Sequence, residues 1–528
     1  MHLLLLVFVL LSLASCQIHY ASVVQNNDQL VIVDSLICTD SAVAFAKWND
    51  SISTTGWGFL TVESNSKFDD KDQMRAVGML EGYLTATRIY QYHNNMWDHT
   101  EGFEEGTPRA LVDHFSQMHD WQQVMVSRYA KSDVFWYQVG LTHAQLDGLH
   151  EGYNKGNPDK PLSFMDLLVQ TAEGDLYETL PALNVTTIPS SLDKILEFQS
   201  CSALIKISPS KSDIWLSHNT WTYYQAMLRI HKTFNLGLNS KYTKNRKMAF
   251  TSKPGYLFSK DDAYILGNGL WVAETTISVA DPALYQYISP ETVLTWARSM
   301  IANRMAETPH QWTEAFKQYN SGTYSNQWMV VDLNGFVPGR GLLPNSFYII
   351  EQLPGSTFTQ DVTHILSRQG YWPSYNIPHS KVMYDRAGYP ELKKKFGDQF
   401  DYDKCPRANI FRRDTATLAS YEDFQRLLRQ NNWETDAFAL GSPKNAIASR
   451  YDLDKENPRA FGAIDAKTAR FSSPRYLSLD IVSGPTYSNP NMKPFTWSTS
   501  GFDGKREGHP DSFNFDWIRT QYLGSICH

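Results

Sequence analysis

Residues 201–218 read Cys-Ser-Ala-Leu-Ile-Lys-Ile-Ser-Pro-Ser-Lys-Ser-Asp-Ile-Trp-Leu-Ser-His. Two β-forming runs flank a turn-like cluster of Ser, Pro and Lys residues, and this pattern predicts an antiparallel hairpin. If Ile207 roughly faces Asp213, counting back along both strands places His218 or Asn219 opposite Cys201. The hairpin therefore brings a thiol and an imidazole to the same end.

A thiol beside an imidazole has a catalytic and a structural interpretation. The thiolate is the attacking form of cysteine, and a neighbouring base or cation raises the fraction that is ionised. However, a cysteine in a β-run is more often a small buried apolar residue. From spacing alone, a structural role for Cys201 and His218 is favoured.

The rest of the chain predicts a mixture of helices and strands. After the hairpin, Asn219 or Thr220 could cap a helix that runs through Phe234. Helical spacing also marks residues 73–92, and residues 51–63 alternate turn formers with β-formers. A polar, proline-marked stretch at 186–193 predicts an exposed connection. No internal repeat or Gly/Ser linker divides the chain into separate units.

The first residues are typical of a secretory leader. An apolar run over residues 3–13 precedes the small residues Ala14 and Ser15, so residues 1–16 are interpreted as a signal peptide. A bacterial lipoprotein box is the minor alternative for residues 13–16. Acceptor triplets for N-glycosylation begin at Asn49 and Asn184. We therefore expect a soluble mature protein that is secreted or held in the lysosomal lumen.

Composition excludes several classes of protein. A net charge of -7 with both signs interspersed provides no basic tract for nucleic acid or anionic membranes. Four cysteines remain after the leader, too few for a disulfide-built scaffold in 528 residues. One disulfide could form among Cys38, Cys405 and Cys527, with the connectivity left open. The sequence contains no metal-ligand spacing and no cofactor motif, so neither a metal nor a cofactor is predicted.

Nine stretches, taken together and in order, resemble the phospholipase B-like proteins, including the lamina ancestor group. They are residues 133–153 (DVFWYQVGLTHAQLDGLHEGY), 201–206 (CSALIK), 217–229 (SHNTWTYYQAMLR), 261–277 (DDAYILGNGLWVAETTI), 321–331 (SGTYSNQWMVV), 374–378 (SYNIP), 406–414 (PRANIFRRD), 483–486 (SGPT) and 508–515 (GHPDSFNF). The resemblance covers nearly all of the mature chain.

The resemblance implies the α+β fold of the N-terminal nucleophile hydrolases, a four-layer αββα sandwich of stacked antiparallel sheets. It also implies that the precursor cuts its own backbone between Ser200 and Cys201, leaving fragments 17–200 and 201–528 associated as one αββα unit. The new α-amine, with an unperturbed pKa of about 8, could then serve as general base for its own thiol. Part of the segment before Cys201 could also be trimmed to admit substrate.

Carried over by resemblance, the active-site cluster falls on Cys201, His218, Trp221, Thr276, Asn376 and Arg407. His218 would orient or polarise, Asn376 would donate to the oxyanion, and Arg407 would stabilise charge or hold a head group. Trp221 and Thr276 would shape the pocket, with Asn326 a candidate of second rank. Without the resemblance, Asn376 would be interpreted as a turn residue and Arg407 as part of a surface ion pair.

Several functions remain open at this point. The expected activity is removal of fatty acyl chains from glycerophospholipids, with hydrolysis of acyl amides or peptides second and a non-catalytic lipid-binding glycoprotein third. A papain-like protease fits poorly, because the signature around its cysteine is absent and His218 follows Cys201 too soon. A serine lipase would need a Gly-x-Ser-x-Gly elbow, which the sequence lacks.

Overall fold

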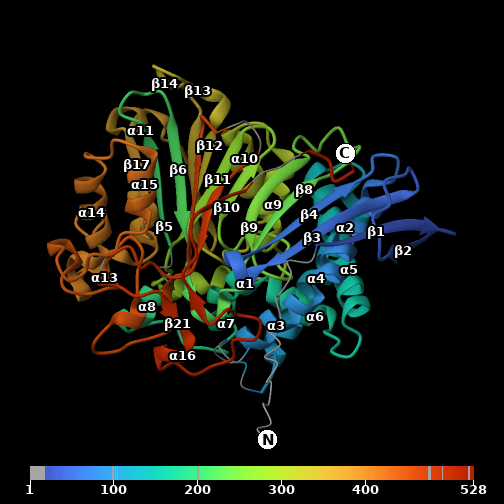
Figure 1. Cartoon of the computed structure of the whole chain (residues 1–528), viewed down its shortest axis with the longest axis horizontal. Coiled ribbons are helices and arrows are strands. Elements are labelled where there is room, and N and C mark those ends of the chain that lie inside the picture. Colours follow the sequence, from blue (N-terminus) through green and yellow to red (C-terminus); the bar gives the residue numbers. More distant parts are fainter. Residues whose placement is uncertain are drawn as a thin grey trace, which may run out of the picture.

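In the computed structural model, two β-sheets face each other and helices lie on their outer sides (Figure 1). The structure describes residues 18–97, 100, 103, 105–198, 201–473, 477–489, 491–520 and 524–527. The signal peptide predicted at 1–16 and Ser200, the residue before the predicted cut, lie outside these ranges. Within them, no helix has both the length and the apolar character needed to cross a bilayer.

The larger sheet has eleven strands and combines residues from before and after position 200. In spatial order its strands are β16 (Ser356–Asp361), β15 (Phe347–Leu353), β12 (Asn326–Asp332), β11 (Leu270–Thr276), β10 (Ala263–Leu266), β9 (Lys247–Ser252), β8 (Ile230–Asn235), β4 (Trp57–Ser64), β3 (Ala42–Ser51), β1 (Ile18–Asn26) and β2 (Gln29–Val33). The junction is the parallel pair of β4 and β8, where Gly58 faces Ile230. The two expected fragments therefore share one sheet.

The second sheet carries the predicted hairpin. Its strands are β17 (Tyr371–Ser374), β5 (Ser202–Ile207), β6 (Ile214–Asn219), β19 (Asp465–Arg470), β20 (Asp480–Ser483) and β23 (Ile518–Arg519). The hairpin is confirmed, but Ile207 faces Ile214 rather than Asp213, and Ser202 faces Asn219. Cys201 therefore lies one residue beyond the last pair, and His218 faces Ala203.

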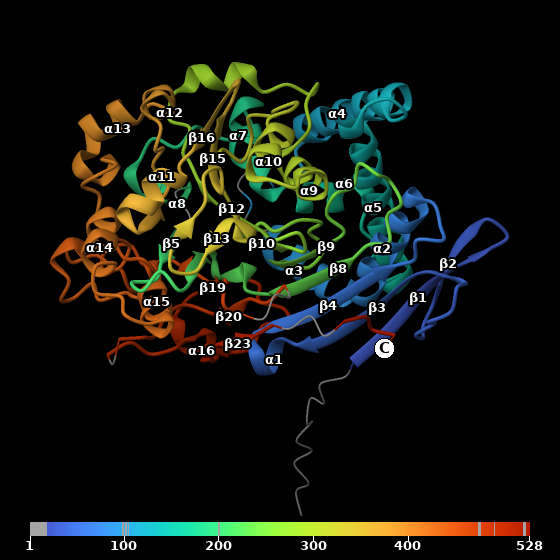
Figure 2. The ribbon, with the colours of Figure 1, turned by 90° about the horizontal axis from the view of Figure 1, so that it is seen from above.

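The helices form the outer layers (Figures 1 and 2). On the larger sheet's side lie α2 (Asp70–Leu84), α3 (Ala86–Trp97), α4 (Arg109–Tyr129), α5 (Val134–Gly156), α6 (Phe164–Thr171), α7 (Leu176–Ala182), α9 (Thr295–Met305) and α10 (Pro309–Phe316). On the smaller sheet's side lie α8 (Leu192–Phe198), α12 (Lys381–Arg386), α13 (Tyr389–Phe396), α14 (Pro406–Asp414) and α15 (Tyr421–Leu428). The helical prediction for 73–92 is thus confirmed as α2 and α3.

Short elements complete the chain. They are α1 (Ile52–Thr55), α11 (Thr363–Gln369), α16 (Trp497–Ser500), β7 (Trp221–Tyr223), β13 (Phe336–Val337), β14 (Gly341–Leu342), β18 (Phe461–Ala463), β21 (Phe495–Thr496) and β22 (Ser512–Phe513). The turn predicted within residues 51–63 is the helix α1 between β3 and β4.

An apolar layer lies between the sheets. The smaller sheet contributes Ile205 and Leu216, and the larger sheet contributes Trp271, Met329 and Ile349. Alternate residues point outward: Leu204 and Trp215 join the core beneath α12 to α15. Successive side chains of each strand point to opposite faces of the sheet, and here both faces are covered. This explains why the sequence of the hairpin is almost continuously apolar.

Helices α2 and α5 approach each other through glycines. A β-carbon at Gly148 would lie 2.0 Å from the carbonyl oxygen of Arg75, and one at Gly78 would lie 2.0 Å from the carbonyl oxygen of Gln145. One turn further along, a β-carbon at Gly152 would lie 2.0 Å from the carbonyl oxygen of Met79, and one at Gly82 would lie 2.3 Å from that of Leu149. Because any larger residue would push the backbones apart, these glycines determine how closely the two helices pack.

The helix predicted to run from Asn219 or Thr220 through Phe234 is wrong. Residues 221–223 form β7, which pairs with β18, and residues 230–235 form β8 in the middle of the larger sheet. The apolar side chains Tyr224, Met227, Leu228, Ile230 and Phe234 are all buried, but on a folded-back path rather than on one helix face. Burial of residues 230–235 between β4 and β9 outweighed the helical spacing of the apolar residues in this segment.

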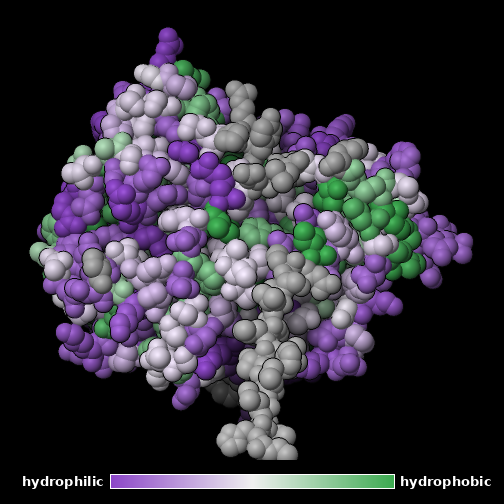
Figure 3. All heavy atoms as spheres, in the orientation of Figure 1, coloured by the Kyte–Doolittle hydropathy of each residue, from purple (hydrophilic) through white to green (hydrophobic). Residues whose placement is uncertain are grey.

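Much of the surface shown in Figure 3 is hydrophilic. Hydrophobic residues gather near β1, β2 and β3, where Ile18 and Val31 are exposed. Residues 186–191 are partly or fully exposed and lead into α8, as predicted for a connection, and the last two residues of the predicted stretch belong to that helix. Of the cysteine pairings left open, Cys38 with Cys527 is the one formed, and Cys201 and Cys405 are free and buried.

Candidate active site

Cys201 lies at the entry to β5 with an unusual backbone. Its φ is 139°, in the region that favours glycine, and its side chain is buried. Such a conformation costs free energy in a residue with a β-carbon, and strained residues concentrate at functional sites. Burial raises the pKa of the Cys201 thiol well above its ordinary value, and the charges of Glu274 and Asp262 add to the rise. The thiol is therefore protonated and needs a base before it can attack.

Arg407 connects Cys201 to the neighbouring loops. One guanidinium nitrogen donates to the carbonyl oxygen of Cys201 and, at 3.1 Å, to the hydroxyl of Ser202. The other donates to the carbonyl oxygen of Tyr375 at 2.9 Å and to Oδ1 of Asn376 at 2.7 Å. Arg407 is only 7% exposed. It is thus part of the site, and the surface ion pair expected without the resemblance is excluded.

Asn376 is both a turn residue and a site residue. Its φ of 70° places it in the left-handed region, just after β17, where asparagine is tolerated. Its Oδ1 accepts from Arg407, and its Nδ2 donates to the carbonyl oxygen of Thr276 at 2.8 Å. The turn interpretation is therefore confirmed, and Thr276 contacts Asn376 through its backbone, while the role of Asn376 as an oxyanion donor stays a prediction.

Trp221 covers the guanidinium. The Cζ atom of Arg407 lies 4.4 Å from the centre of the Trp221 ring. At this distance the positive guanidinium is attracted to the face of the aromatic ring. The Trp221 backbone also hydrogen-bonds to the Cys201 sulfur, which partly opposes the rise in that pKa. A backbone donor beside the nucleophile can stabilise negative charge on sulfur.

His218 lies beside Cys201 and Glu274. One ligand-type atom from each of the three residues falls within 4.8 Å of the others, and all three residues are buried. Burial lowers the pKa of His218 well below its ordinary value, and the charge of Lys467 adds to the effect. The imidazole is therefore neutral, and the backbone of Glu274 approaches its ring. Neither ring nitrogen has a hydrogen-bond partner of normal geometry among the described residues.

Asn326 begins β12 directly opposite Thr276. It is fully buried, and neither atom of its amide has a hydrogen-bond partner in the described part of the chain. A buried amide without partners is costly, so this residue is marked for a ligand or water. Asn326, the candidate of second rank, is thus paired across the sheet with Thr276, a residue of the predicted active-site cluster.

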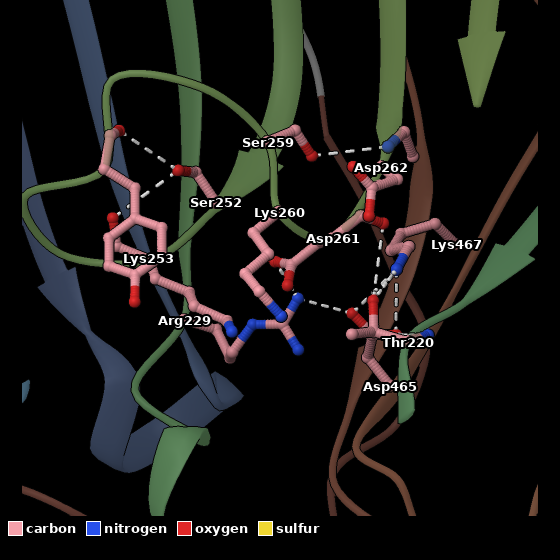
Figure 4. A network of polar contacts seen from close by, with 12 residues as sticks. Thr220, Arg229, Ser252, Lys253, Ser259, Lys260, Asp261, Asp262, Asp465 and Lys467 are labelled. Atoms are coloured by element: carbon pink, nitrogen blue, oxygen red, sulfur yellow. Dashed lines mark hydrogen bonds and ion pairs between the residues drawn. The ribbon is translucent and has the colours of Figure 1, made fainter. Parts of the chain in front are cut away.

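A buried charge network supports the strand end that carries Trp221 (Figure 4). Asp465 accepts from Arg229, from Lys467 and from the Thr220 backbone at 2.8 Å. Lys467 also donates to the Thr220 hydroxyl at 2.6 Å. Although burial opposes it, the charges of Arg229 and Lys467 hold the pKa of Asp465 at about 2. The network therefore fixes the backbone next to the site.

The sequence interpretation missed Glu274, Asp262, Asp465 and Lys467. Two of them, Glu274 and Asp262, lie within the stretch 261–277 that carried the family resemblance, where adjacent carboxylates precede an apolar strand. A charged residue inside an apolar run, as at Glu274, is a signal that could have been used. Asp465 and Lys467 lie in a stretch without a distinguishing motif.

Part of the segment before Cys201 lies against the site. Leu196 of α8 lines a cavity of about 10 Å³ together with Trp221 and Arg407. Residues 186–191 and Lys194 border a second cavity of about 190 Å³, whose apolar wall is formed by Met96, Leu176, Leu180, Tyr223 and Phe461. The same segment therefore lines both the small cavity at Arg407 and the larger apolar one.

The predicted glycosylation residues differ in setting. Asn184 is exposed in a turn after α7, with a φ of 58°. Asn49 lies in β3 opposite Phe59 and is partly buried. Asn184 therefore fits the exposed loop position of a glycosylation acceptor better than Asn49 does.

Known proteins are similar to this sequence over nearly its full length. The Phospholipase B family model matches residues 44–520. Phospholipase B-like protein G of Dictyostelium discoideum is 38% identical over 522 residues, covering 90% of this chain and 86% of that protein. Phospholipase B-like 1 of Rattus norvegicus is 36% identical over 96% of this chain and 92% of its own, and Putative phospholipase B-like 2 of Homo sapiens is 37% identical over 94% and 88%. The chain belongs to the phospholipase B-like family.

Among solved structures, a mutant conjugated bile acid hydrolase from Clostridium perfringens aligns with 61% of this chain and 97% of its own. Its sequence identity is 12% and the TM-score is 0.30. At that score the likeness carries no argument about this chain.

Proposed function

We propose that this chain is a self-processing hydrolase of the N-terminal nucleophile type, with a four-layer αββα arrangement and Cys201 as nucleophile. The observation that carries the proposal is the backbone of Cys201, strained at a φ of 139° while Arg407 holds its carbonyl oxygen. Residues at such angles persist only when their surroundings impose them. The segment that lies against the site leads directly into this residue.

The proposed cut is an N-to-S acyl shift. The Cys201 sulfur attacks the carbonyl carbon of Ser200, its proton passes to the departing Cys201 nitrogen, and the carbon–nitrogen bond breaks to leave a thioester. Water then hydrolyses the thioester, which restores the thiol and frees the carboxylate of Ser200. The strained backbone raises the energy of the intact bond, so breaking it relieves strain.

After the cut, the α-amine of Cys201 would take the thiol proton, and the thiolate would attack the acyl carbon of a substrate. Arg407 and the Trp221 backbone are positioned to stabilise charge close to the sulfur. Asn376 holds Arg407 in place, and it becomes a free oxyanion donor only if its bond to Thr276 is exchanged.

For the substrate, we propose the acyl esters of glycerophospholipids. The apolar cavity of about 190 Å³ supports an acyl chain, since apolar pockets bind apolar chains. Tyr177 lines this cavity, its ring packs on Tyr324, and the Tyr324 hydroxyl contacts Glu274 beside Cys201. Removal of the segment before Cys201 would open this space toward the nucleophile.

We also propose that the protein acts outside the cytosol, in the lysosome or after secretion. The apolar leader-like start supports this, and so does the Cys38–Cys527 disulfide, because such bonds persist in oxidising compartments.

The substrate proposal is tested by incubating processed protein with phospholipids and, separately, with N-acyl amides, and measuring released fatty acid. Cys201→Ala should abolish release, and Cys405→Ala, which removes the other buried thiol, should leave it intact. Release from amides alone would replace the ester proposal with an amidase. Equal release by wild type and Cys201→Ala would contradict the enzyme itself.

A further inference from the structure

We infer that Cys201, His218 and Glu274 form a binding site for a divalent transition metal ion, with zinc as the fitting ion, that restrains the nucleophile. This inference goes beyond hydrolysis to its regulation, and its regulatory part rests on the proposed function. The three residues come from different strands: Cys201 precedes β5, His218 lies in β6, and Glu274 lies in β11 of the facing sheet. A bound ion would join the two sheets at the nucleophile.

The donor set matches zinc chemistry. Thiolate sulfur, imidazole nitrogen and carboxylate oxygen are the protein ligands that zinc takes, with bond lengths of about 2.0–2.3 Å. Tetrahedral geometry at those lengths separates ligand atoms by about 3.5 Å. The three atoms here lie within 4.8 Å of one another. Small side-chain rotations therefore bring them to binding distance.

The donors are also available. Among the described residues, neither ring nitrogen of His218 nor Oε2 of Glu274 has a hydrogen bond of normal geometry, although the Glu274 backbone approaches the His218 ring and Asp262 lies beside the Glu274 carboxyl group. The Tyr324 hydroxyl occupies the other oxygen of Glu274, at 2.9 Å, and so orients the carboxylate. Buried polar atoms without partners are costly and call for a ligand. An oriented carboxylate is also the kind of support that metal ligands receive from neighbouring residues.

Two carboxyl groups lie together at this point. Asp262 and Glu274 are both buried, and the Tyr324 hydroxyl is within hydrogen-bonding reach of both. Burial raises the pKa of Glu274 well above its ordinary value and that of Asp262 to about 6, and the closeness of the two groups adds to the rise for Glu274. Lys260 and Lys467 are engaged with Tyr177 and Asp465 respectively. A divalent ion would therefore take the place of the protons held by the Glu274 carboxyl group and the Cys201 thiol, which would be released to solvent.

The ion would block catalysis, because the lone pair that attacks an acyl carbon would be bound to metal. It would restrain self-cleavage and turnover alike. In the cut form, the free α-amine of Cys201 would be a fourth donor that closes a five-membered chelate ring with the sulfur. We therefore expect zinc to inhibit turnover by the cut form at lower concentration than it inhibits the cut itself.

The test is metal content and cobalt spectroscopy on the full-length secreted protein. Zinc is measured by mass spectrometry of the metal in protein isolated without chelator. The protein is then stripped, loaded with Co²⁺ and scanned for the sulfur-to-cobalt charge-transfer band. We expect about one ion per chain and a band that persists in Cys405→Ser but is lost in Cys201→Ser. Glu274→Gln should weaken Co²⁺ binding at least tenfold.

Activity provides a separate readout. If wild type cleaves itself but shows no charge-transfer band at saturating Co²⁺, the metal site is contradicted and the proposed function stands. If the band is present on loading but neither cleavage nor turnover occurs in the stripped, metal-free protein, the metal site stands and the hydrolase is contradicted. Thermal unfolding of each variant checks its fold. Should Glu274→Gln fail to fold, loss of the band in Cys201→Ser with retention in Cys405→Ser decides the matter.

Discussion

Cys38 and Cys527, 489 positions apart, are joined by a disulfide. They lie on opposite sides of the proposed cut after residue 200, so the bond would link the two fragments covalently. Strands β4 and β8, also from opposite sides of the cut, are neighbours in one sheet. After the proposed cut, the fragments would therefore be held together both by a covalent bond and by backbone pairing.

This link predicts a specific behaviour on denaturing gels. Processed protein should migrate as one band without reductant and as two bands with it. In Cys38→Ser, two bands should appear under both conditions, although native chromatography should still show a single species. Two bands from wild type without reductant would mean that the disulfide does not form in the processed protein.

The rate of self-cleavage should fall even when Arg407 is changed conservatively. Lysine cannot reproduce the forked contacts with Cys201, Ser202 and Asn376, and each charge-assisted hydrogen bond contributes about 1.5–3 kcal/mol. We expect Arg407→Lys to slow self-cleavage at least about tenfold, measured by the band ratio over time. Arg412→Lys, an exposed change in the same helix, is the matched control and should cleave at the wild-type rate.

Two buried carboxyl groups predict how stability depends on pH. Burial raises the pKa of Glu351 to about 7 and that of Glu178 to about 8, from an ordinary value of 4.5. A raised pKa in the folded state means that the stabilisation is present below pH 4.5 and is lost as the pH rises through 7 to 8. For Glu351 the loss is about 3 kcal/mol.

Relative to Glu351→Gln, which stays neutral throughout, the wild-type protein should therefore lose melting temperature between pH 5 and pH 8, as measured by calorimetry. The comparison with this variant is needed because burial lowers the pKa of His143, His231 and His509 to about 3, and their contribution to stability increases as the pH rises toward 6.5. Glu422→Gln, on the exposed side of α15, should follow the wild type. A difference between wild type and Glu351→Gln that is the same at pH 5 and pH 8 would contradict this assignment.

The packing of α2 on α5 yields a prediction about stability. Gly148→Ala places a methyl group 2.0 Å from the backbone oxygen of Arg75, and overpacking of this kind costs about 1–3 kcal/mol. Gly140→Ala in the same helix meets only the Val126 side chain, at 3.0 Å, and gains helix propensity. Denaturant unfolding should show a clear loss of free energy of unfolding for the first variant and little or none for the second.

Local patterns in the sequence predicted the local structure best. The β-runs around Pro209 predicted the hairpin to within one residue of register, and the spacing over 73–92 predicted helices α2 and α3. The helix expected through Phe234 failed because β8 is stabilised by β4 and β9, both distant in sequence. Apolar spacing in a fully buried segment cannot distinguish helix from strand.

The residues of the candidate site likewise differ in how well the local sequence predicted them. Cys201 and His218 are close in sequence, and their proximity could be predicted from the hairpin. Arg407 and Asn376 could not be linked to them by spacing, since four contacts across separate elements bring them together. Family resemblance identified those two residues. Asp465 was missed because its role shows only through its partners Arg229, Lys467 and Thr220, whereas the charge of Glu274 within an apolar strand was a signal left unused.

The proposed hydrolase depends above all on Cys201 cutting the chain at its own amino side. The most direct test is amino-terminal sequencing and intact mass of the larger fragment from reduced wild type, beside Cys201→Ala expressed in the same way. We expect a wild-type fragment that begins at Cys201 and a Cys201→Ala chain that stays uncut at this bond. A fragment that begins at another residue, or the same cut in Cys201→Ala, would contradict it.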